Sequence, residues 1–182
     1  MRFSNTIFSL PSFVALLFAF GMASIAHSQA PETKDTPFRQ VTPAFSVAGQ
    51  LSVDDIRRAA AQGYTLVINN RPDGEGGPDQ PTSAELEKAA KEVGIDYLYT
   101  PFRSGHVTDE AFNQAKMVLS KHEGKTLSFC RSGTRAITVW AMAQSALGNM
   151  PPDDAIKAAR AAGYNLDRQR QTLQTLAAGK TP

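Results

Sequence analysis

Hydrophobic and polar positions along most of the chain form blocks that predict strands alternating with helices. Short continuous apolar runs are typical of strands buried in a sheet. Between them lie stretches of about 10–15 residues with apolar positions three and four apart, as in amphipathic helices. The expected strands are 45–49, 65–69, 96–100 and 125–129, and the expected helices are 52–63, 82–94, 108–119, 136–147, 151–163 and 167–178. This order predicts an α/β fold with three layers, α/β/α, around a mostly parallel central sheet.

The first residues follow a different pattern, which predicts a secretory signal peptide over residues 1–28. Arg2 gives a positive start, residues 13–20 form a short apolar core, and residues 26–28 end in small side chains. An uncleaved membrane anchor is the alternative, although the apolar run is short for a membrane span. We therefore expect a secreted or periplasmic protein with no membrane segment in its mature form. Residues 29–40 are polar and are expected to be a linker, followed by one catalytic domain over residues 41–182.

Composition narrows the candidate chemistry. The chain of 182 residues is 42% hydrophobic and 20% charged, which suits one globular domain with a core. A net charge of +2 gives no sign of nucleic-acid binding. Three histidines and one cysteine are too few for a zinc site, so we expect no metal and no cofactor. Exported proteins usually pair their cysteines, and a free thiol in an oxidising compartment is costly unless it is used.

That single cysteine, Cys130, is expected where the strand 125–129 ends and the helix 136–147 approaches. Free backbone N–H groups and the positive end of a helix dipole meet at such a junction. An anion is stabilised there, and a thiol ionises more readily. The structural alternative is a buried cysteine that only fills space.

The residues after Cys130 are suited to bind an anion. Gly133 and Ser132 allow the backbone of residues 130–135 to form a small cradle with its amides pointing inward. Arg135 adds a permanent cation with a fork of donors. The expected catalytic residues are Cys130 and Arg135, and the expected substrate-binding residues of the loop are Arg131, Ser132, Gly133 and Thr134.

A second loop, residues 70–81, is rich in glycine and proline and follows the strand 65–69. Open α/β sheets bind ligands at this end of their strands. Arg71 is a candidate second anion contact, and Asp73 or Glu75 a candidate acid or orienting residue. For each of these side chains, a solvated turn is the alternative.

Two sequence blocks carry a resemblance to known families. The run CRSGTR of residues 130–135 resembles the active loop of single-domain rhodanese sulfurtransferases. Together with INNRPDGE at 68–75, Gln80-Pro81 and Trp140, the run 129–136 resembles the β-lactamase hydrolase-like protein, phosphatase-like domain family over about residues 38–148. Some members of that family are fused to a persulfide-oxidising metallo-hydrolase domain. The resemblance implies the fold of cysteine-dependent dual-specificity phosphatases.

The chain departs from the true phosphatases in two ways. Only four residues separate Cys130 from Arg135, one fewer than in their signature. Their general-acid aspartate follows a strand like 97–100, whereas the corresponding loop here has no carboxylate before Asp109, and His106 is a candidate replacement. Hydrolysis of a phosphomonoester needs a proton on the leaving group, and a positioned acid contributes roughly 10²–10⁴-fold. Sulfur transfer needs no such proton.

We therefore expect an exported thiolate enzyme that forms a persulfide on Cys130 and transfers sulfane sulfur, with Arg135 orienting the substrate. Its partners would be a small anionic or sulfane-sulfur substrate and a thiol acceptor. Three alternatives stay open. They are phosphomonoester hydrolysis through a phosphorylated cysteine, binding of an anion or persulfide without turnover, and redox exchange through a mixed disulfide.

Overall fold

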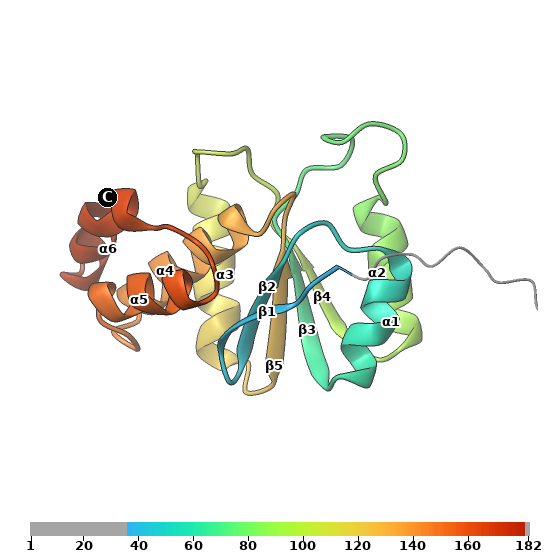
Figure 1. Cartoon of the computed structure of the whole chain (residues 1–182), viewed down its shortest axis with the longest axis horizontal. Coiled ribbons are helices and arrows are strands. Elements are labelled where there is room, and N and C mark those ends of the chain that lie inside the picture. Colours follow the sequence, from blue (N-terminus) through green and yellow to red (C-terminus); the bar gives the residue numbers. More distant parts are fainter. Residues whose placement is uncertain (1–35, 181–182) are drawn as a thin grey trace, which may run out of the picture. The chain divides into compact units, whose positions relative to one another are not determined.

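The computed structural model describes residues 36–180, which belong to one compact unit (Figure 1). The expected signal peptide, residues 1–28, lies outside the described residues, as does most of the expected linker, residues 29–40. Within the described part of the chain, no helix is both long and apolar enough to cross a membrane.

A five-stranded sheet forms the centre of this unit (Figure 1). Its strands are β1 (Arg39–Thr42), β2 (Phe45–Ala48), β3 (Tyr64–Asn69), β4 (Asp96–Tyr99) and β5 (Lys125–Phe129). Their spatial order is β1-β2-β5-β3-β4. Strands β2, β5, β3 and β4 run parallel, and β1 pairs antiparallel with β2. The prediction of a mostly parallel sheet is confirmed.

Strand β1 was not expected from the sequence. It begins at Arg39, so the prediction that residues 39 and 40 belong to a linker is wrong. The strand lies at the edge of the sheet and is partly exposed, and its sequence RQVT has a single apolar side chain. Edge strands of this kind lack the apolar run or alternation by which strands are recognised.

Helices cover both faces of the sheet (Figure 1). They are α1 (Val53–Ala61), α2 (Ser83–Glu92), α3 (Asp109–Lys121), α4 (Thr134–Ala146), α5 (Pro152–Ala161) and α6 (Arg170–Ala177). Helices α1 and α2 lie on one face, α3 and α4 lie on the other, and α5 and α6 pack against α4. The three-layer α/β/α prediction is therefore confirmed. Near the end of the chain, a 3₁₀ turn at Asp167–Gln169 precedes α6, so this helix begins later than the expected residue 167.

Each face of the sheet has its own apolar core. Leu127 and Phe129 of β5 belong to the cluster under α1 and α2. Phe45 of β2 lies on the other side, where its ring stacks on Trp140 of α4 at a centroid distance of 5.3 Å. Alternate residues of a strand point to opposite faces, so β3 has a central apolar run, whereas β5 carries the buried Thr126 and Ser128 between its apolar residues.

A buried amide joins three strand ends at the edge where the sheet meets the functional loops. Asn70, which follows β3, is fully buried. Its Nδ2 donates to the Oγ1 of Thr100, at 2.7 Å, and its Oδ1 accepts from the Oγ of Ser128, at 3.0 Å. The carboxyl ends of β3, β4 and β5 are thereby fixed to one another, because buried polar groups keep their hydrogen bonds.

Candidate active site

Cys130 lies directly after β5, and α4 begins at Thr134, so the cysteine occupies the expected junction of strand and helix. Gly133 is the N-cap residue of α4 and has a φ of 93°, in the left-handed region that favours glycine. The N–H of Gly133 donates a hydrogen bond to Cys130 Sγ over 3.2 Å. One amide of the expected cradle therefore points at the sulfur, and Cys130 is only 1% exposed.

The carbonyl groups of the same loop are held by residues from elsewhere in the chain. The carbonyl of Arg131 accepts a hydrogen bond from the N–H of Gln50, at 3.3 Å. The carbonyl of Ser132 accepts one from Tyr164 Oη, at 3.2 Å. The side chains of Arg131, Ser132 and Thr134 are exposed. The loop is thus fixed through its carbonyls from outside, while its side chains face solvent.

Arg135 lies in the first turn of α4 and is turned inward, with 6% of its surface exposed. Its Nη1 donates to the carbonyl of Phe102, and its Nη2 donates to Glu75 Oε2, each over 2.7 Å. Burial, the largest influence, acts to lower the pKa of Arg135, but the hydrogen bond to Glu75 and the charges of Cys130 and Glu75 outweigh it and raise the pKa. Arg135 therefore remains a cation next to the cysteine.

Glu75 brings a second arginine into the site. Its Oε2 accepts hydrogen bonds from Arg135 and, at 2.9 Å, from Nε of Arg71, which is 7% exposed. Arg71 also donates to Gln50 Oε1, at 2.8 Å. The hydrogen bond from Arg135, followed by that from Arg71, holds the pKa of Glu75 below its ordinary value of 4.5, against the effect of burial. The carboxylate is therefore ionised at neutral pH, and it orients both guanidinium groups.

The two candidate acid–base residues lie in different places. Asp73 Oδ1 accepts a hydrogen bond from the N–H of Ser83, the first residue of α2, over 2.8 Å. His106 is exposed in the loop between β4 and α3, and it lines the same hollow as Thr134 and Arg135. His106 and Arg135 therefore line one hollow, whereas the Asp73 carboxylate is hydrogen-bonded to the first residue of α2.

Tyr164 and Gln50 are parts of the site that sequence reasoning missed. Tyr164 lies between α5 and α6, where no motif marks it. Burial, the largest influence, raises the pKa of Tyr164, and the nearby Cys130 acts in the same direction against Arg39. Gln50 follows β2 and contacts both Arg71 and the cysteine loop. Only the position of Gln50 after a parallel strand could have suggested it.

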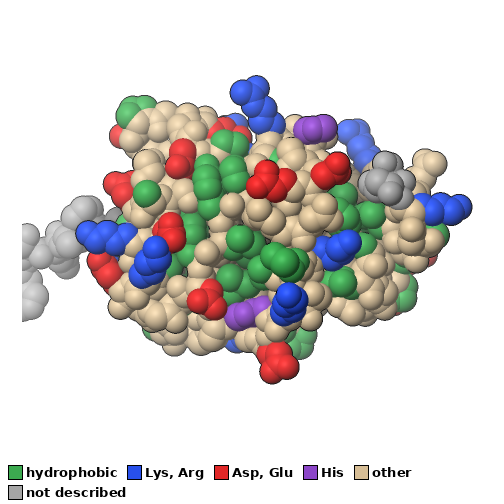
Figure 2. All heavy atoms as spheres, turned by 180° about the vertical axis from the view of Figure 1, so that it is seen from behind, with side chains coloured by type: hydrophobic (Ala, Val, Ile, Leu, Met, Phe, Trp, Pro, Cys, Tyr) green, Lys and Arg blue, Asp and Glu red, His purple; other side chains and the backbone are tan. Residues whose placement is uncertain are grey.

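Another charged cluster among the described residues is exposed and joins Arg160, Asp167, Arg170 and Asp153. Among residues 36–180, no group of three or more His, Cys, Asp or Glu side chains could hold a metal ion. Figure 2 shows basic and acidic side chains interspersed over the face opposite to that of Figure 1. The site around Cys130 thus consists of the N–H of Gly133, the two buried side chains Arg71 and Arg135, and the carboxylate of Glu75 between them.

Replacing Glu75 by glutamine is expected to lower the free energy of unfolding by about 1–3 kcal/mol, because two buried guanidinium groups lose their shared counter-charge. Chemical denaturation at pH 7 measures this effect. The glutamate's contribution is fully present above its ordinary pKa of 4.5 and is lost as the pH falls through the lowered folded value. The wild type should therefore converge on the stability of the Glu75→Gln variant in acid.

The matched control is Glu87→Gln, which removes an exposed ion pair with Lys91 on α2. Its expected cost is within about 0.5 kcal/mol, as for surface pairs in general. If Glu75→Gln and Glu87→Gln lower the free energy of unfolding equally, the carboxylate between Arg71 and Arg135 contributes no more than an exposed ion pair.

The chain is similar to proteins of a known family. The model of the β-lactamase hydrolase-like protein, phosphatase-like domain family matches residues 37–147. The β-lactamase hydrolase-like protein of Xylella fastidiosa (strain 9a5c) is 31% identical over 140 residues, covering 74% of this chain and 32% of that protein. Its namesake from Agrobacterium fabrum is 28% identical over 127 residues, covering 70% and 29%. The chain thus spans about a third of the length of the curated relatives it matches.

Solved structures show the same fold. A phosphatase-like protein from Neisseria meningitidis is 26% identical and superposes with a TM-score of 0.65, covering 76% of this chain and 97% of that chain. PTPMT1 is 19% identical with a TM-score of 0.62, covering 79% and 95%, and supports the fold alone. From these matches, and from a cysteine and an arginine placed together after a parallel strand, the chain belongs to the β-lactamase hydrolase-like protein, phosphatase-like domain family.

Proposed function

We propose that this phosphatase-like cysteine enzyme is a sulfurtransferase that carries sulfane sulfur on Cys130. The state of Glu75 supports this proposal most directly. Among the described residues, Glu75 is the carboxylate that contacts Arg135, and two arginines keep it ionised. It is therefore a poor proton donor, and a reaction that needs no general acid suits this site better than one that does.

Sulfur transfer would proceed in two steps. The Cys130 thiolate attacks the outer sulfur of thiosulfate, a new S–S bond forms, and sulfite leaves with the electron pair of the old one. The cysteine is then a persulfide anion, which the N–H of Gly133 and the cation of Arg135 are placed to stabilise. An acceptor thiolate next attacks the terminal sulfur, which leaves as a new persulfide and restores the Cys130 thiolate.

Phosphomonoester hydrolysis is the second candidate, and the family and its structural neighbours favour it. In that reaction Cys130 Sγ would take the phosphoryl group, the P–O bond would break, and the leaving alkoxide would need a proton. His106, in the hollow beside Arg135, is the candidate donor. The shorter loop between Cys130 and Arg135 leaves less room for a tetrahedral phosphate.

Mass spectrometry of the intact protein separates the two reactions. The protein is incubated with thiosulfate or with an aryl phosphate, and its mass and the released phosphate are measured. We expect a gain of one sulfur atom with thiosulfate and its loss on addition of a thiol. Phosphate release without sulfur loading would establish the hydrolase instead. If neither sulfur loading nor phosphate release is observed, the domain binds its ligand without turnover.

A further inference from the structure

A hollow of about 500 Å³ lies beside the cysteine loop, with Thr134 and Arg135 in its wall. The volume falls in the range of small-molecule sites, about 300–1,000 Å³. Its floor includes the apolar side chains of Phe102, Val107 and Met142. The hollow can therefore hold the organic part of a small molecule whose reacting end approaches the cysteine loop.

The charge of this wall has one sign. Of the residues that the structure describes, two arginines and a histidine line the hollow, and no aspartate or glutamate does. Arg168 stands in the 3₁₀ turn before α6, is exposed, and forms no ion pair or hydrogen bond with residues 36–180. Its neighbour Asp167 pairs with Arg160 and Arg170 instead. Arg168 is thus a cation available to an anionic group in the hollow.

A second group in the wall also lacks a partner. Gln169 Oε1 is buried and accepts no hydrogen bond from any of residues 36–180. An unpaired buried acceptor is costly, and such a group in a native structure calls for an explanation. A ligand with an N–H or O–H donor would satisfy it once a rotation of the Gln169 side chain turns this oxygen into the hollow. Arg168, Gln169 and Thr172 all lie beyond residue 147, where the family match ends.

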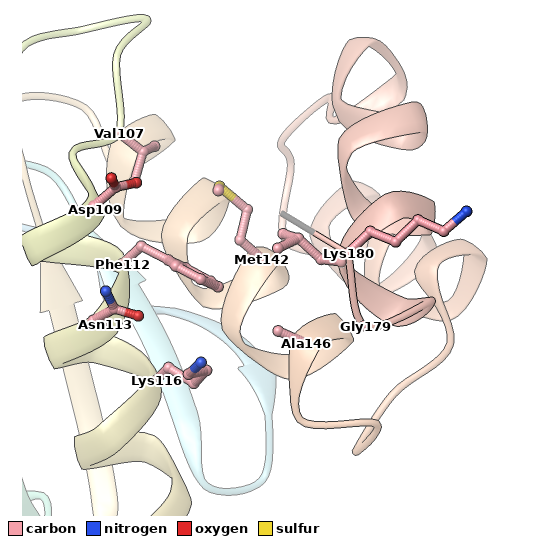
Figure 3. A pocket seen from close by; sticks show the side chains of 10 residues that line it. Val107, Asp109, Phe112, Asn113, Lys116, Met142, Ala146, Gly179 and Lys180 are labelled. Atoms are coloured by element: carbon pink, nitrogen blue, oxygen red, sulfur yellow. The ribbon is translucent and has the colours of Figure 1, made fainter. Parts of the chain in front are cut away.

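The neighbouring hollow of about 390 Å³ between α3, α4 and α6 has a different character (Figure 3). It shares Val107 and Met142 with the first but contains no residue of the cysteine loop. Asp109 lies in it together with Lys116 and Lys180, and Figure 3 shows Lys180 extending away from the α3 residues. Mixed charge and distance from the cysteine loop make it a poorer candidate.

We propose that the hollow beside Arg135 binds the acceptor thiol of the sulfur-transfer reaction, and that this acceptor carries a carboxylate held by Arg168. Gln169 Oε1 accepts a hydrogen bond from an N–H or O–H of the same molecule. The inference rests on the proposed sulfurtransferase function. It assigns the choice of acceptor to the C-terminal segment and leaves the sulfur chemistry to the cysteine loop.

Acceptor selectivity tests the role of Arg168. Persulfide-loaded protein is mixed with N-acetylcysteine or with its methyl ester, which has the same amide N–H but no carboxylate. We expect the wild type to favour the acid over the ester by about tenfold relative to Arg168→Gln, as for one charge-assisted contact. Because both proteins receive the same two thiols, the intrinsic reactivity of each thiol cancels.

Arg57→Gln on α1 is the matched control, since it removes an exposed arginine that does not line the hollow. It should keep the preference of the wild type. An unchanged preference in Arg168→Gln, or an equal loss in Arg57→Gln, would overturn the assignment.

A binding measurement separates failure of the site from failure of the sulfur chemistry. S-Methyl-N-acetylcysteine cannot accept sulfur, so its binding does not depend on a persulfide. We expect its addition to shift the NMR signal of the Gln169 side-chain amide, with about tenfold weaker binding to Arg168→Gln. No shift would refute the site even if sulfur loading succeeds, whereas a shift without sulfur loading would keep the site and refute the sulfurtransferase.

Discussion

Replacing Cys130 by serine should abolish sulfur loading from thiosulfate and lower any hydrolysis of an aryl phosphate by at least about 10³-fold. A serine hydroxyl ionises far less readily than a thiol and forms no bond that carries sulfane sulfur. The hydroxyl can still accept the N–H of Gly133, which now bonds the sulfur. The fold should therefore persist, and the two assays measure the loss directly.

The unfolding free energy of Cys130→Ser is the internal control and should stay within about 1 kcal/mol of the wild type. Sulfur loading that survives in this variant would contradict a covalent role, because the chain has no other cysteine. It would instead support a module that binds the anion without reacting.

Replacing Gly133 by alanine should cost about 2–5 kcal/mol of stability and disrupt the cysteine loop. The φ of 93° is strained for any residue with a Cβ, which accounts for about 1–2 kcal/mol. The added Cβ would also overlap Tyr164 Oη and lie 2.7 Å from its Cζ, and overpacking typically costs about 1–3 kcal/mol more. Thermal and urea unfolding measure the total.

Gly148→Ala separates the two contributions to that cost. Gly148 has a φ of 68°, and a Cβ there would meet nothing within 4 Å. It should therefore show only the backbone cost. If Gly133→Ala and Gly148→Ala lose the same stability, Tyr164 does not press on the loop. In a Tyr164→Ala background, Gly133→Ala should cost only the backbone contribution, because the overlap with the tyrosine ring is then absent.

The junction that carries Cys130 could be predicted because its signals are local. Residues 125–129 alternate polar and apolar side chains as a strand does, Gly133 supplies the left-handed residue, and the helical pattern follows at once. The strand 65–69 followed from a continuous apolar run, and the coverage of both faces followed from the alternation of strands with helices. The helix begins two residues before the expected 136, so Arg135 already belongs to its first turn.

The rest of the site depends on contacts between distant segments. The carboxylate of Glu75 meets Arg135 across 60 positions of sequence, and either could have been a solvated side chain. Tyr164 reaches Ser132 from a connection between two C-terminal helices. No periodicity or motif encodes such pairings, since they depend on how helices pack against the sheet. Strand β1 has a different explanation. Its sequence has one apolar side chain, so it lacks the hydrophobic pattern by which a strand is predicted.

The buried amide of Asn70 bears on how such a domain can diverge. It fastens the ends of β3, β4 and β5 beneath the loops, so the position of the sulfur is set by the sheet. Segments 76–81 and 103–107 can then change length without displacing it. A duplicated copy could acquire new specificity through insertions at these two points, while its reactive centre is inherited intact.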